Sequence, residues 1–96
     1  PLAVCDAKTV EFKDFISAHL RYPDRSGKVF SVRHNQNHRW CYLAAMEEEE
    51  IMLIKCFDTA GPDIAKYTAH TSFYEPDQPT SPIGRKSIEV RALAFF

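Results

Sequence analysis

Apolar residues occur in short runs separated by turn-forming residues, a pattern typical of a protein built mainly from strands. Five or six strands are predicted, from segments over residues 1–6, 28–33, 38–43, 51–57, around residue 70 and over 85–95. The segment 28–33 alternates apolar and polar residues, as a half-buried strand does, and 38–43 is expected to pair back on it as a hairpin. The continuous apolar run 51–57 predicts the most deeply buried strand.

One helix is predicted against these strands. Phe12, Phe15, Ile16 and Leu20 are spaced to share one helical face, so residues 7–20 are expected to be helical or irregular. A short helical turn is expected over 44–50. Turns or loops are expected at 22–27, at 58–63 and in a linker that contains Pro76, Pro79 and Pro82. Many short strands with turn signals between them favour a sheet-on-sheet sandwich or a jelly roll.

The length of 96 residues allows one domain. The chain starts on Pro1 with an apolar strand already under way, so we expect a fragment that lacks its N-terminal half. The net charge of -1 gives no electrostatic footprint for nucleic acid or for an anionic membrane. No apolar run approaches the roughly 20 residues that a membrane-spanning helix needs.

Three cysteines, Cys5, Cys41 and Cys56, are present without a C-x-x-C pair. Their number and spacing predict buried free thiols in a reducing compartment, and therefore a cytoplasmic protein. The absence of a close pair disfavours a zinc site.

The most informative polar residues lie near the end of the chain. His70 offers a neutral imidazole to a divalent metal. Arg85 and Arg91 offer planar forks that suit a carboxylate, and on a strand they would share one face with Ser87 and Glu89. Together these residues suggest a metal beside a dicarboxylate. The alternatives are a solvent-facing strand in which Glu89 pairs with an arginine, and a hydrogen-bonded histidine in the core or at its rim.

The other histidines do not complete a metal site. Non-haem iron of the oxygenase type is held by two histidines and one carboxylate. No histidine of this chain is followed two places on by Asp or Glu. His34 and His38 have a spacing that suits a metal only on a helix, and Asn35-Gln36-Asn37 between them favours a loop. The acidic run 47–50 is expected to be a solvated face.

Several segments, taken in order, resemble one family. They are residues 1–6 (Pro-Leu-Ala-Val-Cys-Asp), 30–35, 38–42, Met46, Glu49, 52–58, 67–73 and 85–92. Together they resemble the C-terminal part of the AsaB-like hydroxylase/desaturase family, also described as CmcJ/NvfI-type oxidoreductases. Members of that family carry a PLAxCD segment just after a WRP segment, and the likeness covers essentially the whole chain.

The resemblance implies an iron(II)/2-oxoglutarate-dependent dioxygenase-like fold, a double-stranded β-helix of the jelly-roll or cupin type. Residues 1–96 would be its C-terminal portion, and the His-x-Asp/Glu pair would lie upstream of Pro1. His70 matches the distal iron ligand. Arg85 and Ser87 match the Arg-x-Ser that binds the far carboxylate of 2-oxoglutarate, with Arg91 as a second candidate. The separation of His70 from Arg85 is longer than in many relatives, and Tyr74-Glu75-Pro76-Asp77 stands where relatives have Asp-Asp-Pro.

The expected reaction is hydroxylation or desaturation of a small secondary metabolite with dioxygen and 2-oxoglutarate, and the fragment alone is expected to be inactive. The expected partner is a small-molecule substrate, with no nucleic acid and no membrane. Trp40, Tyr42 and Phe73 are candidates to line its pocket, although core packing is the favoured explanation for each. There are two alternatives for the whole chain. One is a non-catalytic β-sandwich module with a binding or structural role, and the other is an inactive truncated gene product.

Overall fold

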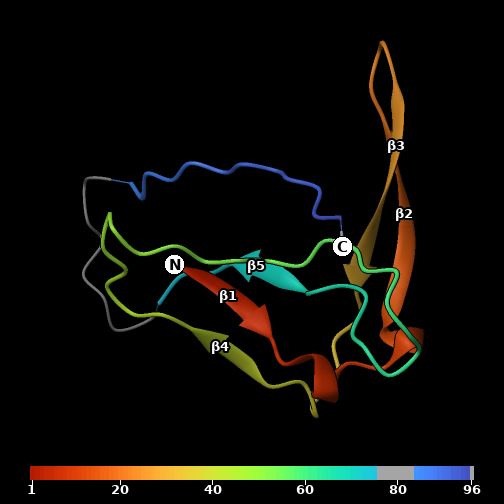
Figure 1. The fold of residues 1–96 in the computed structure, drawn as a ribbon, viewed down its shortest axis with the longest axis horizontal. Coiled ribbons are helices and arrows are strands. Elements are labelled where there is room, and N and C mark those ends of the chain that lie inside the picture. Colours follow the sequence, from red (N-terminus) through yellow and green to blue (C-terminus); the bar gives the residue numbers. More distant parts are fainter. Residues whose placement is uncertain (76–83, 96) are drawn as a thin grey trace.

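A computed structural model describes residues 1–75 and 84–95 of the chain. Its strands form two small antiparallel sheets (Figure 1). The strands are β1 (Leu2–Cys5), β2 (Phe15–Arg21), β3 (Ser26–Val32), β4 (Trp40–Tyr42) and β5 (His70–Ser72). Across these two ranges the structure contains no α-helix, only two 3-10 turns, η1 (Ala7–Thr9) and η2 (Phe12–Asp14). The prediction of a mainly β chain is therefore confirmed.

Strand β1 lies in the middle of a three-stranded sheet with the order β4-β1-β5. Val4 is paired with Cys41 on one side and with His70 on the other. Backbone bonds continue this sheet at both ends of β5, because Cys5 N donates to the carbonyl of Ala69 at 2.8 Å and Phe73 N donates to that of Pro1 at 3.2 Å. Strand β1 is short and apolar, with no Gly or Pro inside it, so both of its edges are available for pairing.

Strands β2 and β3 form a separate hairpin that projects away from the other sheet (Figure 1). Its turn is the predicted one, closed by a bond from Tyr22 N to the carbonyl of Arg25 at 2.8 Å. The predicted strand at 28–33 is confirmed, but its predicted partner is wrong. Strand β3 pairs with β2, whereas the segment 38–43 supplies β4 to the edge of β1.

The predicted helix over 7–20 is wrong for most of its length. Asp6 caps η1 by accepting a bond from Lys8 N at 3.0 Å. After η2 the chain becomes β2, and its side chains alternate across the hairpin instead of sharing a helical stripe. Seven residues of β2 pair with β3, and this pairing provides hydrogen-bond partners for the backbone N–H and C=O groups. Strand pairing is therefore preferred to a helix, although Phe12, Phe15 and Ile16 have helical spacing.

Two further predicted strands are wrong. The segment 51–57 forms no strand, and most of its side chains are exposed, 83% for Ile51 and 93% for Leu53, while Met52 and Ile54 are half-buried. The segment 85–95 is also unpaired, with Ile88 95% exposed. Residues 44–50 form turns without a helix. The predicted linker with Pro76, Pro79 and Pro82 lies outside the described residues.

The buried core is small. Its buried apolar residues among those described are Ala3, Cys5 and Ala69. The expectation of buried thiols therefore holds for Cys5 and is wrong for Cys41 and Cys56, which are exposed. None of the helices in the two described ranges is long and apolar enough to cross a bilayer.

An aromatic cluster joins the hairpin to the segment that leads into β5. The Tyr67 ring lies 5.8 Å from that of Phe15, 5.1 Å from that of Phe30 and 5.9 Å from that of Phe57, measured between centroids. Phe15 and Phe30 are themselves in edge contact at 5.7 Å. Such pairs contribute beyond their buried area, so this cluster holds the two sheets together.

We expect Phe15→Ala to lower the free energy of unfolding by about 2 kcal/mol, because it removes a half-buried ring that touches two others. Phe12→Ala is the matched control. Phe12 is 76% exposed, so its loss should cost about 0.5 kcal/mol or less. Urea denaturation of both variants measures the difference, and equal losses would contradict the role given to the cluster.

Candidate functional site

His70 opens β5 and is fixed there by the pairing of its neighbours with β1. Its Nδ1 lies 2.9 Å from the carbonyl oxygen of Thr68. A carbonyl oxygen only accepts, so in this contact Nδ1 carries the hydrogen. The neutral ring then keeps its lone pair on Nε2, and the side chain is exposed. This arrangement, in which a carbonyl orients the ring from behind, is the usual one for a metal-binding histidine.

The rest of a metal site is not formed by the described residues. Within 1–75 and 84–95 no group of three or more His, Cys, Asp or Glu side chains is placed to hold a metal. His70 therefore fits one position of an iron site, and this part of the chain does not fill the others. His34 and His38 lie in a loop, as predicted, and not on a helix.

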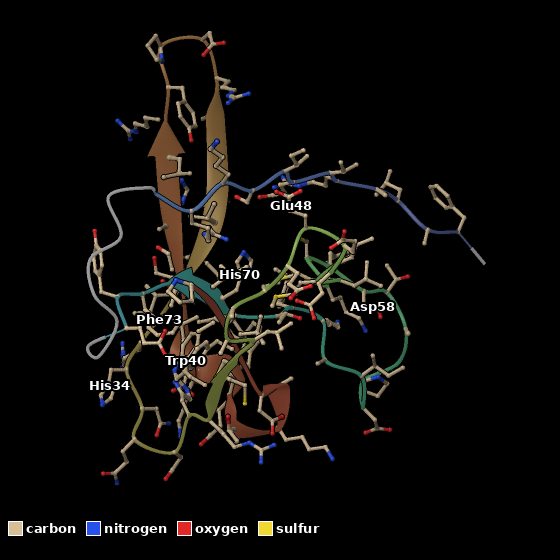
Figure 2. The ribbon with its side chains drawn as sticks, turned by 90° about the vertical axis from the view of Figure 1, so that its left-hand side faces the viewer. His34, Trp40, Glu48, Asp58, His70 and Phe73 are labelled. Atoms are coloured by element: carbon tan, nitrogen blue, oxygen red, sulfur yellow. The ribbon has the colours of Figure 1, made fainter. Side chains whose placement is uncertain are left out.

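The register of the three-stranded sheet decides which residues share a face with His70. Paired residues in antiparallel strands point to the same side. Val4 and Cys41 therefore lie on the His70 face, whereas Ala3, Tyr42 and Thr71 lie on the other. Trp40 and Phe73 lie together on the side away from His70 (Figure 2).

The face away from His70 carries an apolar cavity of about 410 Å³, lined by Ala3, Trp40, Tyr42, Thr71 and Phe73. The rings of Tyr42 and Phe73 meet edge to face at 4.9 Å. The Tyr42 hydroxyl donates to Glu75 Oε1, and this bond to a carboxylate raises the pKa of the phenol above its usual value of 10.0. Tyr42 and Phe73 thus pack together on the face away from His70, and Trp40 lines the same cavity, so none of the three aromatic residues surrounds His70.

The arginines predicted to bind a carboxylate lie on the unpaired segment 84–95, which runs apart from the sheets (Figure 1). Because this segment is not a strand, the shared strand face argued for Arg85, Ser87 and Arg91 is wrong as a description of this chain. Arg91 Nη2 donates to Glu89 Oε1 at 3.2 Å, and both side chains are about four-fifths exposed, 79% and 80%. Such an exposed pair contributes little to stability.

The structure also shows a buried polar contact that the sequence did not reveal. His38 Nε2 lies 3.0 Å from Asp14 Oδ2, and the two side chains are only 2% and 5% exposed. The same carboxylate oxygen accepts bonds from Glu11 N at 3.1 Å and from Asn35 Nδ2 at 3.4 Å. The contact ties η2 to the loop that leads into β4. The residues lie 24 positions apart, and the only local signal was the turn-forming Asn35-Gln36-Asn37.

The His38 contact acts on the acidity of Asp14. A hydrogen bond from His38, followed by one from the backbone of Glu11, lowers the pKa of this carboxyl below its usual value of 3.8. Hydrogen bonds to the charged form favour ionisation and outweigh the cost of burial here. The folded chain therefore holds Asp14 as a carboxylate.

Comparison with known proteins places the chain in a class of oxidoreductases. A family model described as an oxidoreductase/YMDC permease-like domain matches residues 1–95. The hydroxylase/desaturase asaB of Aspergillus flavus is 31% identical over 110 residues, which cover 100% of this chain and 48% of asaB. The hydroxylase/desaturase CTB9 of Cercospora beticola is 37% identical over 100% of this chain and 32% of its own length.

The name of a third relative states the metal and the cosubstrate that it depends on. The Fe(II)/2-oxoglutarate-dependent dioxygenase nvfI of Aspergillus novofumigatus is 31% identical over 99% of this chain and 34% of its own length. The chain belongs to this family, that of the AsaB-like hydroxylase/desaturases, and is homologous to fungal enzymes of secondary metabolism. It spans less than half the length of these relatives.

We expect the Asp14 contact to make the fold sensitive to acid. A carboxyl whose pKa is lower in the folded than in the unfolded chain stabilises the fold fully above its unfolded pKa, near 3.8. That contribution is lost as the pH falls through the folded-state pKa. Asp14→Asn should therefore flatten the fall in stability below pH 3.8, as measured by denaturation at stepped pH.

The control for this prediction is Asp24→Asn, in the exposed turn of the hairpin. This substitution should leave the fall in the free energy of unfolding at acidic pH the same as in the unchanged chain. A profile that Asp14→Asn does not alter would show that the His38 contact is absent in solution.

Proposed function

We propose that this chain is the C-terminal portion of an iron(II)/2-oxoglutarate-dependent oxygenase that hydroxylates or desaturates a small secondary metabolite. The observation that carries the proposal is the orientation of His70, whose Nδ1 is bonded to the Thr68 carbonyl and whose Nε2 is left with its lone pair. The family membership of the chain supports it, and nvfI is described as a dioxygenase of this kind. Iron with 2-oxoglutarate supplies the oxidising power for attack on an unactivated C–H bond.

The surface of the chain supports the idea that the oxygenase domain extends beyond it. The accessible surface is 9164 Å², whereas a compact folded monomer of 11.0 kDa exposes about 5,600 Å². The radius of gyration is 15.6 Å, against about 12.5 Å expected for 96 residues. We infer that residues 1–96 form part of a double-stranded β-helix and that its remaining strands cover the exposed apolar side chains.

Each candidate residue has a distinct part in this proposal. His70 holds the metal through Nε2, and the remaining His-x-Asp/Glu ligands come from the sequence before Pro1. Arg85 binds the far carboxylate of 2-oxoglutarate as a charge-assisted pair, and the Ser87 hydroxyl adds a donor. Arg91 is a second candidate to bind that carboxylate. Its guanidinium would first have to break its hydrogen bond to Glu89.

The simplest test of the proposal is the sequence that precedes Pro1 in the complete reading frame. A His-x-Asp or His-x-Glu there would supply the two ligands that the described part of this chain does not. Its absence would favour a non-catalytic β-sandwich module or an inactive truncated product.

We expect the complete polypeptide to show a weak visible charge-transfer band when iron(II) and 2-oxoglutarate are added without oxygen. His70→Ala should abolish the band because it removes a metal ligand. His19→Ala is the matched control, since His19 is an exposed histidine on the hairpin and should leave the band unchanged. A band that survives in His70→Ala would contradict the role of His70.

We expect Arg85→Ala to weaken binding of 2-oxoglutarate by about 10- to 100-fold, the loss that follows when a charge-assisted hydrogen bond is removed. Titration of the same band measures this change. Lys86→Ala removes the same charge from the adjacent position and should have little effect. If Arg91→Ala weakens binding and Arg85→Ala does not, the carboxylate site belongs to Arg91.

A further inference from the structure

The His70 face of the three-stranded sheet contains a row of three side chains. Val4 lies at the centre of the row, because it is paired with His70 on β5 and with Cys41 on β4. Leu2 and Ser72 form the next pair along the same face. The row is fixed by backbone pairing and does not depend on any one side-chain contact.

Strand spacing sets how far each member of the row lies from His70. Val4 is one strand away, about 5 Å, and Cys41 is two strands away, about 10 Å. Non-haem iron of the oxygenase type is held by two histidines and one carboxylate, so a site that His70 shares with a His-x-Asp/Glu pair has no place for a thiolate ligand from Cys41. Cys41 is exposed on this face, and Val4 is half-buried.

We propose that Val4 and Cys41 form the wall of the reaction chamber beside His70, and that Cys41 faces the metal without binding it. Both side chains are small and offer no strong hydrogen-bonding group, so the part of the substrate that passes over them is hydrocarbon. This inference rests on the proposed function, since it needs a metal at His70. It assigns the opposite role to Tyr42, the next residue of β4, which faces the apolar cavity on the back of the sheet.

A paramagnetic metal bound at His70 tests whether position 41 or position 42 faces the metal. In the complete polypeptide with Cys56→Ser, a trifluoromethyl label is placed on Cys41. In a second variant with Cys56→Ser, Cys41→Ser and Tyr42→Cys, the label is placed at position 42. Manganese(II) and 2-oxoglutarate are then added, and relaxation of the fluorine signal is measured. Because this effect falls steeply with distance, we expect it to be several-fold stronger at position 41 than at position 42.

The outcomes separate this inference from the proposed function. Equal relaxation at the two positions, or stronger relaxation at position 42, would contradict the role of Val4 and Cys41 as the chamber wall. It would leave the proposed metal at His70 intact. Loss of relaxation at both positions in His70→Ala is expected. Relaxation that persists without His70, or no manganese binding to the unchanged polypeptide, would overturn both.

A second measurement separates a wall residue from a ligand. Cobalt(II) bound through a thiolate gives an intense sulfur-to-metal absorption, and Cys41→Ser would remove it and weaken the binding of cobalt. We expect no such absorption and the same cobalt affinity in Cys41→Ser and in the unchanged polypeptide. A thiolate absorption that depends on Cys41 would overturn its assignment to the wall.

Discussion

The pairing of β1 along both of its edges is the constraint on which the rest of the structure depends. Four residues, Leu2–Cys5, receive β4 on one side and β5 on the other, although those strands come from distant parts of the sequence. A shift of this register by one residue would turn every side chain to the opposite face. The pairing thus decides that His70, Val4 and Cys41 lie together and that the aromatic residues lie behind them.

The His70 face of the three-stranded sheet is well defined by strand pairing, whereas the hydrophobic core of the chain is small. Few apolar side chains are buried among the described residues, and the surface is much larger than that of a compact monomer of this mass. The aromatic cluster around Tyr67 and the Asp14–His38 contact hold the described elements together. Exposed apolar residues such as Leu53 and Ile88 still need a covering surface. Under the proposed function, a longer oxygenase domain would supply that surface and the remaining metal ligands together.

The sequence was informative where local pattern and pairing agree. The strands at Leu2–Cys5 and His70–Ser72 were predicted, as were the turn before β3 and the loop that holds His38. The segments 51–57 and 85–95 were predicted as strands because a run of apolar residues indicates burial, yet a strand also needs a partner edge, which sequence pattern does not supply. The same limit hid the Asp14–His38 contact. Family resemblance predicted His70 as an iron ligand, which stays a prediction, whereas only the register could show that Trp40 and Tyr42 face away from it.

The central claim is that His70 binds a metal through Nε2 while Nδ1 stays bonded to Thr68. A crystal structure of the complete polypeptide with manganese(II) and 2-oxoglutarate tests it most directly. The account predicts Nε2 of His70 at bonding distance from the metal, with the Nδ1 to Thr68 carbonyl bond retained. A metal bound by other residues, with His70 turned away from it, would contradict the account.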